Sequence, residues 1–572
     1  MTIETIDITL PNYGTIRGSV DTQRQVAIFR NVPYAHVTER WRVAVKVQPW
    51  SGVRDATVQG PVQPQGPTTI SQAELISEEY RKIGPHPINQ YGLEHSERDG
   101  LNLNITVPLS ALKAGAAPIP VMTYIYGGSL CNGNNAIPLY DARNLVEHSV
   151  RLDMPVLVVQ PNYRVAAFGF LASKELQDDM DEYVRQSQNP IPVYNQSVGN
   201  WGLQDQKLAF EWVRENIAAL GGDNKNVTAF GQSAGSLSLH HHMVLPAHHG
   251  LFDHAILQSG AIGALPTGTV EQDGQATFDA LVAALGIPAD LPALEKVKRL
   301  RAVPAEELTT AGEAASLGLP FRPFHDGGKV LPSTIPLEAW SSLPSSYDPN
   351  LKSVMIGANK NEGFGIDISF GERNLKTWPG LLNAFAPTPH LKTLFKAAYG
   401  SPETDEDVVK IVAEYPGDLV FQYPIERAFN ALVQVSKARE GKFHLERYHF
   451  DLEIEQSSLA MPGCGSIHGG ELLYVFDPPM NDDAFTEAER AAAREVQKRW
   501  IAFANQKPVV VGDGKSTASA KKGQAVVWTK DYEIKVGKGV RLSDDVLAFW
   551  GAVMEVKLEK IQQGLDAHRK EI

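Results

Sequence analysis

The segment Gly231-Gln232-Ser233-Ala234-Gly235 carries the pattern G-x-S-x-G between a short β-prone run, Asn226–Phe230, and a helix-compatible segment. Glycines on both sides of a serine allow a turn so sharp that the hydroxyl stands exposed at the end of the strand. The positive N-terminus of the following helix then faces any negative charge that develops there. The pattern alone is weak in a chain with 48 glycines, but its position between strand and helix predicts a nucleophile at Ser233 and a serine hydrolase.

A serine nucleophile needs a base, an acid that orients the base, and hydrogen-bond donors for the oxyanion. Glu362 follows the β-rich run Ser353–Ala358, and the carboxyl end of a parallel strand is where ligands gather in such sheets. His468 lies in a glycine-rich loop before an apolar run. The chain order serine, acid, histidine is the one that α/β hydrolases use. Glu362 and His468 are therefore candidates for the acid and the base.

The elements that must position these residues follow an α/β pattern. Apolar runs typical of strands buried on both faces occur at 121–126, 156–160, 226–230, 254–259 and 353–358. They alternate with helical patterns such as Gln204–Ala219. This alternation predicts a mostly parallel, doubly wound sheet flanked by helices. We expect a single domain over 1–572, with a lid-like loop at 61–102, helical insertions at 278–319 and 377–439 that roof the pocket, and a further helix within 542–569.

Composition excludes several classes of function. The net charge of −13 argues against a surface for nucleic acid or anionic membranes. No apolar run approaches the roughly 20 residues that cross a bilayer. The first residues lack the basic start and apolar centre of a secretion signal, which favours a cytoplasmic protein. Histidines occur at 240–242, 248 and 249, but consecutive histidines on a helix point in different directions, so we expect no metal site and no cofactor.

The chain resembles the type-B carboxylesterases, the family of carboxylesterases, cholinesterases and large fungal lipases, which have the α/β-hydrolase fold. The matching segments lie in the family's order along nearly the whole chain. They are Asn31-Val-Pro-Tyr-Ala35, Leu101-Asn-Leu-Asn104, Tyr126-Gly-Gly128, Asn162-Tyr-Arg164, Gly199–Gln206, Gly221-Gly-Asp223, Gly231–Gly235, Gln258-Ser-Gly260, Asp326-Gly327, Asn359–Gly363 and His468–Phe476.

The resemblance implies roles for individual residues. Ser233 aligns with the nucleophile, Glu362 with the acid and His468 with the base. The oxyanion donors implied are the backbone N–H groups of Gly128, Ser129 and Ala234. The implied reaction is hydrolysis of a carboxylic ester through an acyl-serine intermediate, with small or medium uncharged esters as substrates and no cofactor.

The chain departs from the family pattern at three positions. Ser129 stands where the family usually has a third glycine, so its side chain either narrows the acyl site or requires a backbone angle that glycine adopts more easily. Gly100 replaces the first cysteine of a loop disulfide, which leaves the 61–102 segment less tethered. Gln232 replaces the more common glutamate before the nucleophile, which removes one negative charge.

Several alternatives stay open. The long 61–102 loop would suit a lipase, and the same fold could serve an acyltransferase or a lactone-processing enzyme of secondary metabolism. A non-catalytic binding scaffold is the alternative from another class. Cys131 and Cys464 flank the site regions, as free thiols or as a pair under oxidation. Ser259 is interpreted as a buried polar group beside the site rather than a nucleophile. Glu471 is an alternative to Glu362 as the acid, but the resemblance places it where the family has a structural glutamate. The expected partner is a small ester, without nucleic acid or stable membrane insertion, and a homodimer is left open.

Overall fold

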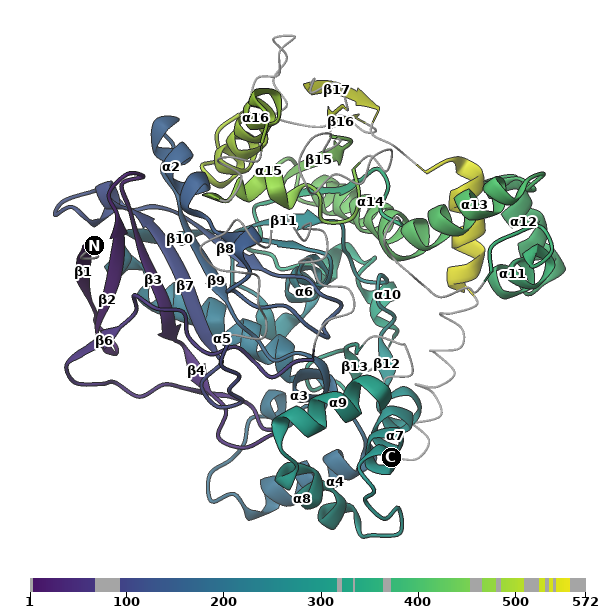
Figure 1. Cartoon of the computed structure of the whole chain (residues 1–572), viewed down its shortest axis with the longest axis horizontal. Coiled ribbons are helices and arrows are strands. Elements are labelled where there is room, and N and C mark those ends of the chain that lie inside the picture. Colours follow the sequence, from purple (N-terminus) through teal and green to yellow (C-terminus); the bar gives the residue numbers. More distant parts are fainter. Residues whose placement is uncertain are drawn as a thin grey trace.

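A large central sheet organises the molecule (Figure 1). The computed structural model describes residues 4–66, 93–315, 321–332, 335–363, 372–452, 466–479, 485–508, 524–529, 534–538 and 542–555. Within these residues the strand order is β1-β2-β3-β7-β9-β8-β10-β11-β14-β15-β16-β17, and β6 also pairs with β2. The first half of this order comprises β1 (Thr5–Leu10), β2 (Gly14–Asp21), β3 (Val26–Pro33), β7 (Asn102–Pro108), β9 (Leu157–Pro161) and β8 (Ile119–Ile125). The second half comprises β10 (Gly222–Gln232), β11 (His254–Gln258), β14 (Ser353–Asn359), β15 (His444–Phe450), β16 (Gln524–Trp528) and β17 (Ile534–Lys538), with β6 at Val53–Asp55.

From β9 to β16 in this order the strands pair parallel with one another. β1, β2, β3, β7 and β9 pair antiparallel in turn, β17 is antiparallel to β16, and β6 is parallel to β2. All five predicted strands are present in the parallel block, so the prediction of a mostly parallel central sheet is confirmed there. β8 pairs with β9 on one side and with β10 on the other. The strand order therefore reverses at β8, and the loops that follow β8 and β10 meet at this switch point.

Helices cover both faces of the parallel block. Figure 1 shows α2 (Arg143–Arg151), α15 (Leu472–Phe476) and α16 (Glu487–Ala504) on one side, and α3 (Ala166–Phe170), α5 (Trp201–Asn216) and α6 (Ala234–Val244) on the other. Side chains of β8, β9, β11 and β14 are almost all buried, as continuous apolar strands between two helical layers require. The predicted helix 204–219 corresponds to α5 and the short 3-10 turn that follows it at Ile217–Leu220.

Both segments predicted as helical insertions are helical where the structure describes them. The first contains α7 (Gln275–Ala284), α8 (Ala293–Ala302) and α9 (Ala305–Ala315). α8 packs against α4 (Lys174–Gln186), an earlier helix of the chain. The second contains α11 (Trp378–Phe385), α12 (Pro389–Tyr399), α13 (Asp405–Gly417), a π-helical turn η9 (Asp418–Gln422) and α14 (Tyr423–Ala438). Residues 316–319 lie outside the described residues.

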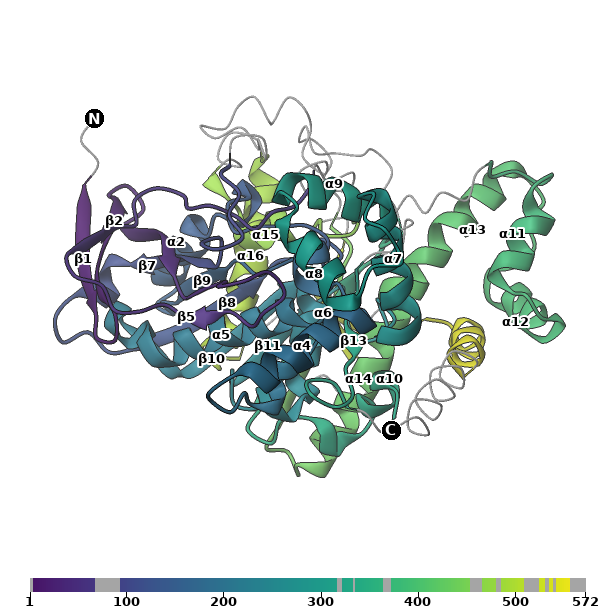
Figure 2. The same cartoon turned by 90° about the horizontal axis from the view of Figure 1, so that it is seen from below.

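The second insertion has a hydrophobic core of its own. Phe385, Phe395 and Tyr415 pack there against Phe549 and Trp550 of a helix at 544–555. Figures 1 and 2 place α11, α12, α13 and this helix at one end of the molecule, opposite β1. The helix predicted within 542–569 is therefore present as far as it is described, and residues 556–569 lie outside the described residues.

The lid-like loop predicted at 61–102 falls mostly on residues 67–92, which are also outside the described residues. Its two described ends are joined to each other. The Val62 N–H donates to Glu94 O at 2.9 Å, and the Asn102 side chain donates to Pro61 O at 2.7 Å. Within the described residues, every helix is too short or too polar to span a membrane.

Candidate active site

Ser233 forms the turn between β10 and α6. Its backbone has φ 57° and ψ −124°, a strained conformation for a residue with a side chain. Two backbone hydrogen bonds hold the turn: the Ser233 N–H donates to Gln258 O at 2.8 Å, and the Leu237 N–H donates to Ser233 O at 2.9 Å. The serine is partly exposed while its neighbours in the turn and the helix are almost all buried. The hydroxyl thus lies at the carboxyl end of β10 and at the N-terminus of α6.

The glycines around Ser233 are required by close backbone contacts. A Cβ at Gly235 would lie 1.9 Å from Ile125 O of β8, and a Cβ at Gly231 would lie 2.8 Å from the same oxygen. A Cβ at Gly260, after β11, would lie 2.1 Å from Ser233 O. The G-x-S-x-G pattern therefore reflects the packing of three adjacent strand ends, which is what exposes the serine.

Glu362 and His468 meet at the ends of β14 and of the loop before α15. Glu362 Oε2 lies 2.6 Å from His468 Nδ1, and its Oε1 accepts the Asn359 N–H at 2.6 Å. The Glu362 side chain is fully buried, while the His468 side chain is 19% exposed. A buried carboxylate on Nδ1 fixes the tautomer that leaves Nε2 available as a base. The structure thus brings together the acid and the base that the sequence predicts.

The loop that carries His468 is bonded to the end of β14. The Asn361 N–H donates to Ser466 O at 2.9 Å, and the Asn359 amide donates to Ile467 O at 2.7 Å and to Glu471 Oε2 at 2.5 Å. Burial, reinforced by the charge of Glu362, raises the pKa of Glu471 to about 7. Glu471 is a buried hydrogen-bonding partner of the strand ends, as predicted.

Two residues of the second insertion, which the sequence does not single out, contact this loop and the end of β14. The Phe421 ring stacks on the His468 imidazole with centroids 4.0 Å apart and an interplanar angle of 27°. The Gln422 amide donates to Asn359 O at 2.6 Å. Both belong to η9, and π-helical turns are frequent at functional sites. The inserted helices therefore reach the candidate acid–base pair, a contact for which the sequence holds no local signal.

Nε2 of His468 faces Gln232, whose amide nitrogen lies 3.0 Å away. Among the described residues, no hydrogen bond joins Ser233 to His468. The three candidate residues therefore lie on adjacent strand ends, with the acid–base contact made and the nucleophile–base contact not made in this conformation. Apo active sites often have loose nucleophile–base contacts that form when substrate binds.

The loop after β8 lies against the serine. A Cβ at Gly127 would lie 2.9 Å from Ser233 Cβ. Positive φ angles at Gly128 (113°), Ser129 (56°) and Leu130 (61°) coil the loop tightly. The Gly128, Ser129 and Ala234 N–H groups donate to none of the described residues, so all three are available to a ligand. At Ser129, the expectation of a backbone angle that glycine adopts more easily is met.

A glutamine fixes the far end of this loop. Gln65 Oε1 accepts the Gly133 N–H at 2.8 Å, and Gln65 Nε2 donates to Gly133 O at 3.1 Å. Cys131, which lies between Ser129 and Gly133 in the same loop, donates its thiol hydrogen to Ser129 O at 3.3 Å. Burial raises the pKa of this thiol to about 11. Its suggested partner Cys464 lies outside the described residues.

The clustered histidines are buried and paired with protein groups. His240 contacts Tyr347, His241 donates to Leu237 O, and His242 lies between His248 and Gln206. Burial lowers the pKa of His240 and His242 to about 3. Within the described residues, no three or more His, Cys, Asp and Glu side chains are grouped so as to hold a metal ion. His240, His241, His242 and His248 are therefore buried core residues, whereas His249 is partly exposed. Ser259 is likewise buried, and its hydroxyl has no partner among the described residues.

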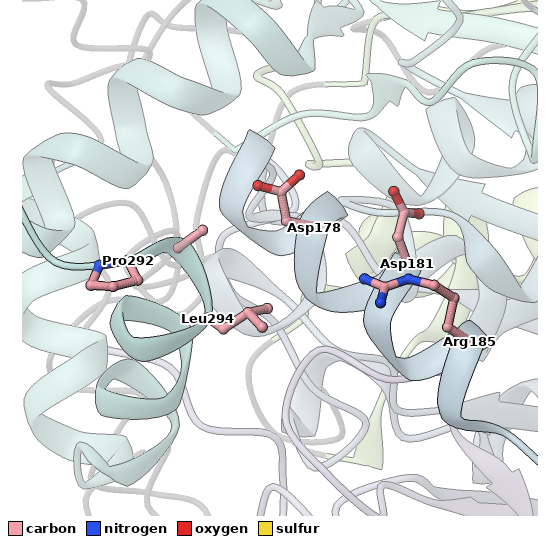
Figure 3. A pocket seen from close by; sticks show the side chains of 6 residues that line it. Asp178, Asp181, Arg185, Pro292 and Leu294 are labelled. Atoms are coloured by element: carbon pink, nitrogen blue, oxygen red, sulfur yellow. The ribbon is translucent and has the colours of Figure 1, made fainter.

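An open hollow of about 440 Å³ lies between α4 and α8 (Figure 3). Its described lining is Asp178, Asp181, Arg185, Pro292, Ala293 and Leu294. None of the candidate site residues belongs to that lining. The hollow is charged on the α4 side and apolar on the α8 side, and it is separate from the strand ends that carry the acid–base pair.

Comparison with known proteins gives consistent matches. The profile of the carboxylesterase family matches residues 4–530. The chain is 30% identical to the para-nitrobenzyl esterase of Bacillus subtilis, over 87% of this chain and 90% of that protein. It is 27% identical to the acetylcholinesterase of Leptinotarsa decemlineata, over 94% of this chain and 84% of that protein. A solved structure of a PNB esterase matches with a TM-score of 0.70 and 27% identity, covering 93% of this chain and 96% of the other.

Proposed function

The chain belongs to the carboxylesterase family and has the α/β-hydrolase fold, and we propose that it hydrolyses small to medium uncharged esters with a triad of Ser233, His468 and Glu362. The observation that carries the triad is the 2.6 Å contact between Glu362 and His468 beside the strained turn of Ser233. Support for ester hydrolysis comes from the match to a para-nitrobenzyl esterase.

In the first half of the reaction, His468 Nε2 takes the proton of the Ser233 hydroxyl while the oxygen attacks the ester carbonyl carbon. The carbonyl oxygen gains the negative charge, which the N–H groups of Gly128, Ser129 and Ala234 stabilise. One such donor is typically worth about 3 kcal/mol of the barrier. The tetrahedral intermediate then breaks its bond to the alkoxy oxygen, which leaves as the alcohol with the proton from His468.

In the second half, His468 takes a proton from water while the water oxygen attacks the acyl carbon bound to Ser233. The new tetrahedral intermediate expels the serine oxygen, which recovers the proton from His468, and the carboxylic acid is released. Glu362 remains ionised throughout and stabilises the imidazolium that forms in each half. Because a water and an alcohol compete for the same acyl-enzyme, acyl transfer would differ only in the attacking molecule.

The test combines labelling with turnover. A fluorophosphonate probe should label Ser233, located by mass spectrometry of the digested protein, and the Ser233→Ala variant should remain unlabelled and inactive while keeping its fold. A series of p-nitrophenyl esters of increasing acyl length then sizes the acyl site. Preference for dispersed long-chain lipid would favour a lipase, and ester products formed with an added alcohol would favour an acyltransferase. A folded protein without labelling would contradict the triad and favour a binding scaffold.

A further inference from the structure

Gln232 contacts the nitrogen of His468 that the proposed mechanism uses. It is the last residue of β10, and its amide nitrogen lies 3.0 Å from Nε2 and 3.5 Å from Nδ1. Nδ1 is held by Glu362 at 2.6 Å, so Nε2 is the nitrogen that is left for Gln232. The same nitrogen must accept the Ser233 proton. In the free protein, the glutamine and the serine therefore compete for one lone pair.

Whether the Gln232 amide can donate a hydrogen bond to Nε2 depends on the protonation state of His468. A neutral imidazole with its hydrogen on Nδ1 offers a lone pair at Nε2, which accepts a hydrogen bond from an amide N–H. An imidazolium carries hydrogens on both nitrogens, so its Nε2–H would face the amide hydrogens of Gln232. The contact therefore favours the neutral ring.

The surroundings fix the orientation of the glutamine amide. A Cβ at Gly127 would lie 3.0 Å from Gln232 Oε1, so the oxygen end of the amide lies toward the loop after β8 and the nitrogen end toward His468. Phe421 covers the face of the imidazole ring and limits its rotation. The carboxyl groups beside the ring are Glu362 from the end of β14 and Glu471 from the start of α15. An ionised carboxylate favours an imidazolium, whereas the amide N–H of Gln232 favours the neutral ring.

On the basis of the proposed function, we propose that Gln232 is a positioning residue: it occupies Nε2 of His468 in the free enzyme, holds the imidazole neutral, and yields Nε2 to Ser233 when the ester binds. The consequence is an esterase whose base stays active in more acidic solution than the two neighbouring carboxyl groups would otherwise allow.

Two substitutions test this. Gln232→Met keeps the length of the side chain and removes the donor, and Gln232→Glu replaces the donor with a charged acceptor. We would measure kcat and kcat/KM for p-nitrophenyl butyrate from pH 5.5 to 8.5. The acid limb of kcat/KM reports the free enzyme and that of kcat reports the substrate complex. In Gln232→Met the limb of kcat/KM should move up by about 0.7 pH unit, as expected for one ordinary hydrogen bond, and the limb of kcat should stay in place. In Gln232→Glu both limbs should move up further.

An acid limb of kcat/KM that stays in place in Gln232→Met would overturn the inference. A limb that moves to lower pH would overturn it too, because it would mean that the amide oxygen of Gln232 faces His468. Titration of the His468 ring by NMR, with His468→Gln for assignment, measures the same contact independently of turnover. Its midpoint should rise in Gln232→Met. If the wild-type protein neither labels at Ser233 nor turns over esters, the proposed function fails, and the NMR midpoint alone then decides whether Gln232 holds the ring neutral.

Discussion

At the residue scale, Glu362 uses each carboxylate oxygen for a different task. Oε1 accepts the Asn359 N–H and Oε2 accepts from His468 Nδ1. In Glu362→Gln the amide presents an N–H where one of these acceptors is needed, so the imidazole loses its fixed tautomer. We expect kcat to fall by about 10³- to 10⁴-fold, as for the equivalent change in other triads, with an unfolding midpoint near that of the wild type.

Glu147→Gln provides the control, because Glu147 pairs with Arg151 on the surface of α2 and the substitution should leave kcat unchanged. Rates would be measured with p-nitrophenyl butyrate, and folding by urea denaturation followed by circular dichroism. Wild-type kcat in Glu362→Gln would remove Glu362 from the triad.

The role of Gly235 is steric, and two helical glycines allow a matched comparison. A Cβ at Gly235 in α6 would meet Ile125 O at 1.9 Å, and this backbone atom of β8 cannot move aside. A Cβ at Gly380 in α11 would meet nothing within 4 Å. Gly235→Ala should therefore yield little folded protein, whereas Gly380→Ala should gain up to about 1 kcal/mol from helix propensity. Equal urea midpoints for the two variants would contradict the close packing of β8 against the serine turn.

The sequence predicts the residue types of the site better than their contacts. Ser233, Glu362 and His468 each follow a local pattern, and it is the order and context of the three patterns together that select them. The positions of Gln232 and Phe421 against the His468 ring depend on side-chain packing between segments far apart in the chain. Neither hydrophobic periodicity nor the spacing of motifs predicts such a contact.

At the element scale, the sequence predicts the strands that are continuous apolar runs and misses those that carry polar residues, including β7, which is buried at every position but contains Asn102 and Asn104. β8, β9, β11 and β14 read as continuous apolar runs. The missed strands carry polar residues: β1 alternates exposed and partly buried positions, and β15 contains Glu446 and Arg447. Arg447 is paired with Glu426 of α14 and Glu446 with Arg499 of α16, and such pairing from distant helices allows charges in a strand of the sheet.

The turn η9 joins the active-site loop to the second hydrophobic core. Asp418 at its start accepts the Tyr399 hydroxyl at 2.8 Å, and the Trp550 indole N–H donates to Tyr399 at 2.9 Å. Burial, and to a smaller extent Glu414, raises the pKa of Asp418 to about 7. One side chain of η9 thus contacts the helix α12, and another, Phe421, contacts His468.

Asp418 should make the protein less stable as the pH rises. Its folded pKa lies above its unfolded value of 3.8, so the folded state keeps a proton that the unfolded state has lost. The free energy of unfolding therefore decreases between about pH 4 and 7, by about 4 kcal/mol at most from this group. Asp418→Asn stays neutral, so its urea midpoint should exceed that of the wild type by more at pH 8 than at pH 5. Tyr399→Phe, which removes the donor to the carboxylate, should lower the midpoint at pH 8. Equal destabilisation by Asp418→Asn at both pH values would refute the assignment.

At the scale of the whole molecule, the buried histidines make the free energy of unfolding increase with pH, whereas Asp418 makes it decrease. Among the described residues, burial lowers the pKa of seven of them: to about 3 for His240 and His242, to about 4 for His241, His254 and His449, well below its usual value for His248, and below its usual value for His325. In the unfolded chain each would take up a proton near pH 6.5. Stability from these groups is therefore complete above about pH 6.5 and is lost as the pH falls toward 4.

The histidines outweigh the buried carboxyl groups in this range. Asp418 and Glu471, both with a pKa of about 7, release a proton on unfolding, as does Asp326, whose pKa burial also raises, while the more numerous buried histidines bind protons. Each proton taken up in excess on unfolding corresponds to about 1.4 kcal/mol of lost stability per pH unit. Because domains are stable by only about 5–15 kcal/mol, the urea midpoint should fall steeply between pH 6.5 and 5 and change little from these histidines between pH 7 and 9. His254→Gln should reduce the acid slope by about 1.4 kcal/mol per pH unit, one proton's share. A urea midpoint that is unchanged or higher at pH 5 would mean that these histidines are solvated or charged in the folded protein. The loss of activity at acidic pH would then reflect catalysis alone and not unfolding.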